Sequence, residues 1–76
     1  MASMEGRVII SQESRFQLLD RNGVCHHFVL SYACSAEPEQ LPALQRVQAR
    51  VRVRYRPAAD LLAHAALSIT VLDGGP

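Results

Sequence analysis

The sequence predicts an all-β fold, a five-stranded antiparallel barrel with one short helix between its third and fourth strands. Residues 49–56, ARVRVRYR, alternate arginine with apolar residues, which is the period of a strand with one buried face. The tripeptide RNG at 21–23 is the strongest turn signal in the chain and separates two apolar runs, as in a β-hairpin. Between these regions, over 35–48, apolar residues recur at helical spacing.

The first three strands come before the helical segment. Residues 6–11, GRVIIS, are a β-branched run suited to a strand. Residues 14–20 alternate in polarity, and 24–33 predict a longer strand after the turn. One face of this longer strand, expected to be buried, carries Val24, His26, Phe28, Leu30 and Tyr32.

The register of the hairpin follows from these faces. A two-residue loop would scatter apolar side chains over both faces. A three-residue loop over 21–23, with its glycine in the left-handed conformation, pairs Phe16 with Phe28 and buries both rings. The same register pairs Leu18 with His26. Because a one-residue slip turns every side chain to the other face, burial selects the three-residue loop with a bulge.

The middle of the chain predicts a helix of two turns at most. Ser35 can cap its start, and Pro38 and Pro42 are tolerated only near a helix N-terminus. Leu41, Leu44 and Val47 would then lie on its apolar side.

The last two strands flank a short connection. The strand over 49–56 ends at Pro57, which cannot donate to a strand ladder. Residues 58–65 predict a loop or a helical turn, and 66–73 predict the fifth strand. Tyr55 has the parity of the buried face.

These segments follow the order β-β-β-α-β-β, opened by GRVIISQESRFQLLDRNG. The order resembles the oligonucleotide/oligosaccharide-binding (OB) fold, and LQRVQARVRVRY and AHAALSITVL are similar to its fourth and fifth strands. The likeness is topological, covers nearly the whole chain, and extends to short bacterial proteins of the same outline. It implies a barrel whose open end is plugged by the helix, with no long free edge. An SH3-like barrel and a two-layer α+β sheet are the alternatives.

Length and composition predict one domain over 1–76, with 1–5 and 74–76 frayed. Hydrophobic residues at 49% and charged residues at 20% are ordinary for a globular chain, so disorder is expected only at the ends. The opening MASMEGR lacks the apolar segment of a secretory signal, and no run is long enough to span a membrane. We therefore expect a cytoplasmic protein with no membrane partner.

The main candidate site is the row of Arg50, Arg52, Arg54 and Arg56, called here the arginine row. Alternate residues of a strand lie about 6.6–6.8 Å apart on one face, which is close to the phosphate step of an extended single strand. Guanidinium groups also bind phosphate oxygens in pairs and stack on bases. The leading hypothesis is therefore weak binding of single-stranded DNA or RNA by this row.

Two observations weigh against that hypothesis. The net charge is only +1, whereas domains that bind nucleic acid through general phosphate attraction are usually strongly basic. The row could also be a solvated face whose guanidiniums pair with Glu5, Glu13 and Asp73.

The OB resemblance implies a different binding face, the outer side of strands two and three, whereas the arginine row lies on strand four. This chain places Arg15, Gln17, Leu19, Cys25, His27, Val29 and Ser31 on that face. The face has one basic residue and no aromatic residue for base stacking. Arg15 and His27 are therefore the secondary candidates.

The sequence CHH at 25–27, together with Cys34, has ligand types that zinc prefers. Adjacent histidines on a strand point to opposite faces, however, and Cys34 lies far along the chain. We expect no metal site and no disulfide between Cys25 and Cys34, which suits a reducing compartment.

No nucleophile motif such as G-x-S-x-G and no glycine-rich phosphate loop occurs. Asp60 and His64 would share a face if their segment were helical, and a structural salt bridge is the expected meaning. We expect neither an enzyme nor a cofactor.

A competing hypothesis is a protein-interaction or homodimerisation module. Leu19 and Val29 on the outer face, with Ile9 nearby, would form a modest apolar patch. Exposed apolar patches on small domains often mark a partner.

Overall fold

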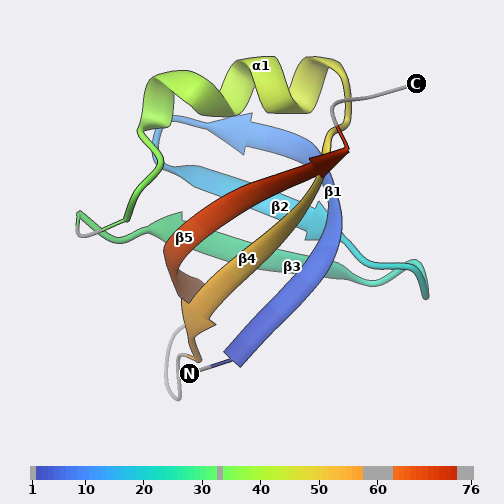
Figure 1. Ribbon diagram of the computed structural model, residues 1–76, viewed down its shortest axis with the longest axis horizontal. Coiled ribbons are helices and arrows are strands. Elements are labelled where there is room, and N and C mark those ends of the chain that lie inside the picture. Colours follow the sequence, from blue (N-terminus) through green and yellow to red (C-terminus); the bar gives the residue numbers. More distant parts are fainter. Residues whose placement is uncertain (1, 33, 58–62, 74–76) are drawn as a thin grey trace.

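Five strands close into a barrel in the order β1-β2-β3-β5-β4 (Figure 1). The computed structural model describes residues 2–32, 34–57 and 63–73. The strands are β1 (Ala2–Gln12), β2 (Arg15–Leu19), β3 (Cys25–Leu30), β4 (Arg50–Arg56) and β5 (His64–Asp73). A 3-10 turn, η1 (Pro38–Gln40), leads into the helix α1 (Leu41–Arg46), which lies across one end of the barrel. The predicted order of elements is confirmed, and it is compatible with an OB-like topology.

The sheet is mixed, so the expectation of a purely antiparallel barrel is wrong. β3 and β5 run parallel, from Phe28 opposite His64 to Leu30 opposite Ala66. The other four pairings are antiparallel. The reason is geometric: strands that alternate in direction cannot close a ring when their number is odd, so one neighbouring pair must be parallel.

The hairpin between β2 and β3 has the predicted register. Phe16 pairs with Phe28 and Leu18 with His26. The Asp20 N–H donates to the carbonyl of Val24 at 3.0 Å, which encloses a three-residue loop. Its glycine has a φ of 81°, the left-handed conformation that the sequence predicts.

β1 is longer than predicted and pairs with two neighbouring strands. Its first half, from Ala2 to Arg7, pairs with β4, and its second half, from Arg7 to Gln12, pairs with β2. Residues 2–5 were expected to be frayed but are part of this ladder. A register shift between Val8 and Ile10 marks a bulge, which bends the strand around the barrel.

The core lies between the strands and beneath α1. It comprises Val8, Phe16, Leu18, Phe28, Leu41, Ala49, Val51, Val53 and Ala66. The Phe16 and Phe28 rings stack at 5.1 Å, and Tyr55 meets Phe28 edge-on at 5.4 Å. These contacts confirm that the alternation along β2, β3 and β4 separates the core from the solvent.

Two residues that the sequence places on the buried face of the longer strand are exposed. Tyr32 is fully exposed, because β3 ends at Leu30 and the Cys34 N–H then donates to the Ser31 carbonyl in a turn. Val24 is also exposed, because it lies at the end of the hairpin loop rather than in β3.

The helical segment starts later than predicted and extends over 38–46. Glu37, not Ser35, is its N-cap, and the Glu37 N–H donates to the side-chain oxygen of Gln40 at 2.8 Å. The expected fraying of 74–76 and most of the connection at 58–65 lie outside the described residues. Within the described ranges, no helix has the length and apolar character needed to cross a membrane.

Candidate functional site

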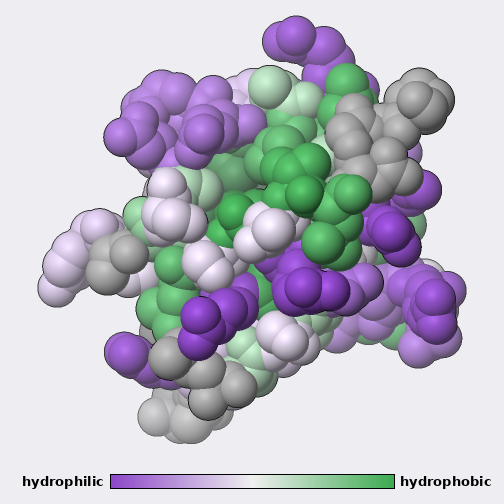
Figure 2. Space-filling view, viewed as in Figure 1, coloured by the Kyte–Doolittle hydropathy of each residue, from purple (hydrophilic) through white to green (hydrophobic). Residues whose placement is uncertain are grey.

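The arginine row lies along the outer face of β4, as the alternating sequence predicts. All four of its side chains are exposed, whereas the two valines between them are 0% exposed. In Figure 2, hydrophilic side chains cross the face on which β4 and β5 lie, beside an apolar area. The fold therefore presents the guanidinium groups to solvent from a strand that the core holds in place.

The two central arginines have polar neighbours on both adjoining strands. Their backbone partners are Glu5 and Ser3 on β1, and Thr70 and Ser68 on β5. Carboxylate and hydroxyl side chains therefore flank the row on both sides.

Arg52 is already paired with a carboxylate. Its Nε and Nη2 donate to Oε2 of Glu5 at 3.1 and 2.7 Å. This hydrogen bonding, followed by the charges of Arg52, Arg50 and Arg21, holds the pKa of the Glu5 carboxyl below its usual value. Both side chains are about half exposed, at 49% and 47%, so water screens the pair.

The other two carboxylates expected to pair with the row are those of Glu13 and Asp73. Glu13 lies in the turn between β1 and β2, beyond the part of β1 that pairs with β4. Asp73 is the backbone partner of Arg50 at the end of β5. Among the described side chains, neither Arg50 nor Arg56 makes a hydrogen bond or an ion pair. The prediction that the row is a solvated face whose guanidiniums pair with carboxylates is thus confirmed at Arg52.

The secondary candidates, Arg15 and His27, line one groove of about 350 Å³ over β1, β2 and β3. Its lining includes a cross-strand row of Ile10, Gln17 and His27. The sequence reasoning missed Ile10, which is 48% exposed because the bulge in β1 reverses the parity of the residues that follow it.

The arginine row and this groove are separate surfaces. The row is on β4, whereas Arg15 and His27 belong to β2 and β3. β1 separates β4 from β2 on one side, and β5 separates β4 from β3 on the other. One extended ligand would have to pass around the barrel to contact both.

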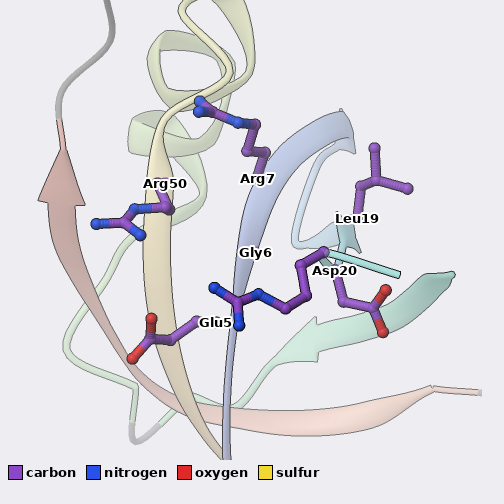
Figure 3. A pocket seen from close by; sticks show the side chains of 7 residues that line it. Glu5, Gly6, Arg7, Leu19, Asp20 and Arg50 are labelled. Atoms are coloured by element: carbon purple, nitrogen blue, oxygen red, sulfur yellow. The ribbon is translucent and has the colours of Figure 1, made fainter. Parts of the chain in front are cut away.

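A third concave site, which the sequence did not predict, has a volume of about 550 Å³. It lies where β1, the hairpin loop and the start of β4 meet, and Figure 3 shows Arg7 and Arg50 extending from neighbouring strands at its border. Arg21 and the carboxylates of Glu5 and Asp20 complete its charged lining. Arg7 could have been found as the residue opposite Arg50, but only once the barrel order was known.

The Asp20 carboxylate makes its hydrogen bonds within the hairpin. Its Oδ1 accepts from the backbone N–H groups of Asn22 and Val24 at 2.9 and 3.0 Å. Its Oδ2 lies 2.8 Å from Nε2 of His26. The hydrogen bond with His26, and then those from the backbone, hold the pKa of the Asp20 carboxyl below its usual value.

The residues considered for metal binding and catalysis are dispersed. Within the described ranges, no three His, Cys, Asp or Glu side chains are grouped as metal ligands, and both cysteines are free thiols. His64 packs against the rings of Tyr55 and Phe28, with centroids 4.8 and 5.6 Å away. Its expected partner, Asp60, lies outside the described residues.

The outer-face apolar pair is less prominent than expected. Leu19 and Val29 are both half-buried. Among the residues that the structure describes, the large apolar side chains that stand exposed are Ile10, Val24, Tyr32, Val47 and Val71.

Searches of protein-family models, curated proteins and solved structures found no match to the chain. Its functional assignment therefore depends on the geometry of these side chains.

Proposed function

We propose that the protein is a small, non-enzymatic domain that binds single-stranded nucleic acid weakly through the arginine row. The observation that supports this proposal is the row itself, four exposed guanidiniums on one face of a strand whose other face is core. Their spacing of about 6.6–6.8 Å suits successive phosphates of an extended strand.

Two features account for weak binding. Glu5 accepts two hydrogen bonds from Arg52 and places a negative charge beside the row. The aromatic residues nearest the row offer little for base stacking, since Tyr55 is on the opposite face of β4 and contacts Phe28. Binding then depends on phosphate contacts, which salt weakens.

The test is an amide chemical-shift titration with short mixed-sequence DNA and RNA, at low and at physiological salt. We expect shifts over 50–56 that diminish with salt. Replacing Arg52 and Arg54 with Ala should weaken binding equally for all sequences and reduce the salt slope by about 0.7 for each phosphate that is no longer neutralised. Arg46→Ala, an exposed change on α1, is the matched control and should have no effect.

Other outcomes would contradict this assignment. Shifts confined to 15–19 and 25–31 would place binding in the groove of Arg15 and His27. A titration without shifts, or an unchanged salt slope in the double variant, would refute binding by the row.

The competing function is a protein-interaction or homodimerisation module, favoured by the exposure of Ile10 and Val71 at 48% and 50%. It predicts a size that rises with concentration in light scattering and a loss of association on Val71→Glu. A strict monomer at millimolar concentration would refute self-association.

A further inference from the structure

Three arginines that are distant in sequence line the 550 Å³ site, called here the junction pocket. Arg7 comes from β1, Arg21 from the hairpin loop and Arg50 from the first position of β4. Arg7 and Arg50 are direct backbone partners across the β1–β4 ladder, so their side chains leave from adjacent points (Figure 3). Like charges directly opposite each other are destabilising, and here the Nη1 of Arg7 donates to the backbone carbonyl of Gln48 at 3.0 Å.

The backbone holds the three segments together. Gly6 lets β1 approach the end of β2 so closely that a side chain there would lie 2.5 Å from the Leu19 carbonyl oxygen. The next residues are the hairpin loop, whose shape Asp20 stabilises by accepting two backbone hydrogen bonds. Arg21 is therefore carried to the pocket by an ordered turn.

The two carboxylates at the pocket make their hydrogen bonds with groups other than its three arginines. Asp20 is hydrogen-bonded to its own loop and to His26, and Glu5 is bonded to Arg52, which is outside the pocket lining. The hydrogen bond with Arg52 is the main cause of the lowered pKa of the Glu5 carboxyl, and the charges of Arg50 and Arg21 add to it.

We propose that the junction pocket binds a phosphate monoester, with Arg7, Arg21 and Arg50 contacting the phosphate group. Guanidinium groups match phosphate oxygens in paired hydrogen bonds and keep their charge at all physiological pH values. The pocket volume is within the range of about 300–1,000 Å³ found for small-molecule sites, so the alcohol portion of the ester also fits.

Two sources share this chemistry, a free small phosphate ester and the terminal phosphate of an oligonucleotide. Phosphate binding in the pocket does not depend on strand binding by the arginine row, because a small phosphate can occupy the pocket alone. Only Arg50 belongs to both surfaces.

The first experiment is an amide-shift titration of the full chain with inorganic phosphate and then with 5′-AMP, at fixed ionic strength. We expect saturable shifts at Gly6, Arg7, Arg21 and Arg50. Arg21→Gln should weaken binding about tenfold, since it removes a charge-assisted hydrogen bond. Arg46→Gln, the control on α1, should leave the affinity unchanged.

A second variant should act in the opposite direction. Glu5→Gln removes the negative charge at the pocket and releases Arg52, so phosphate should bind more tightly. A change that merely loosened the fold would not increase affinity. Shifts that do not saturate, or equal affinities for Arg21→Gln and Arg46→Gln, would overturn the proposal.

The source is distinguished with one oligonucleotide carrying either a 5′-phosphate or a 5′-hydroxyl group. Tighter binding of the phosphorylated form, abolished in Arg21→Gln, identifies a strand end as the ligand. Equal binding of the two forms, with saturable 5′-AMP binding, identifies a free ester. If the arginine row does not bind a strand but the pocket does bind phosphate, phosphate will shift the pocket amides and the 5′-hydroxyl oligonucleotide will shift none.

Discussion

Glu5 on β1 and Arg52 on β4 are direct cross-strand partners, and Oε2 of Glu5 accepts from both Nε and Nη2 of Arg52. This pair joins the two proposed surfaces, because Glu5 lines the junction pocket while Arg52 belongs to the arginine row. One carboxylate thus opposes anion binding at both.

Glu5→Gln should therefore strengthen oligonucleotide binding as well as phosphate binding. A half-exposed ion pair contributes modestly, so we expect the oligonucleotide affinity to rise about twofold to fivefold at low salt. Fluorescence anisotropy with a labelled oligonucleotide measures this. Glu39→Gln, which removes an exposed charge in η1, is the control and should have no such effect. Unchanged or weaker binding by Glu5→Gln would count against the arginine row as a phosphate track.

Gly6→Ala should destabilise the fold. The added methyl group would lie 2.5 Å from the Leu19 carbonyl oxygen and 2.8 Å from Cγ of Leu18, and backbone cannot move aside cheaply. Overpacking of this kind costs about 1–3 kcal/mol of unfolding free energy, measured by urea denaturation. Gly23→Asn is the matched control, because that position is open and asparagine tolerates its positive φ. Equal stability of Gly6→Ala and the native chain would refute the close approach.

Asp20 should make the hairpin sensitive to acid. Its folded-state pKa is below the ordinary value of 3.8, so the ionised carboxylate stabilises the native state above that pH. This stabilisation is lost as the pH falls through the folded-state pKa. The difference in melting temperature between the native chain and Asp20→Ala should therefore be largest near pH 5–7 and shrink towards pH 2. A difference that does not vary with pH would show that the charge of Asp20 is not involved.

Phe28→Ala should cost about 3–5 kcal/mol, the usual effect of removing a buried aromatic ring. Phe28 is 1% exposed and contacts the rings of Phe16, Tyr55 and His64. Small domains are stable by only about 0.05–0.15 kcal/mol per residue, or about 4–11 kcal/mol for 76 residues, so urea denaturation should show that this variant loses a large part of its stability. Phe28→Leu, which keeps much of the volume, should remain folded. A loss of less than about 1 kcal/mol in Phe28→Ala would mean that the aromatic cluster is not the centre of the core.

The sequence by itself determined the features that depend on neighbours along the chain. The alternation in β4 fixes which side chains are buried, because successive residues of a strand point to opposite faces. The hairpin register followed from the left-handed Gly23 and from burial of Phe16 and Phe28. The arginine row was predicted on the same basis.

Only the tertiary structure decided the features that depend on closure of the barrel. The parallel β3–β5 pair follows from the odd number of strands, and the exposure of Ile10 follows from a bulge that bends β1 between two neighbours. The junction pocket depends on the same closure, since Arg7, Arg21 and Arg50 meet only when β1 contacts β4 and the hairpin together. The periodicity of a strand predicts which face each of its residues occupies. Which residues lie beside it depends on packing between segments that are distant in sequence.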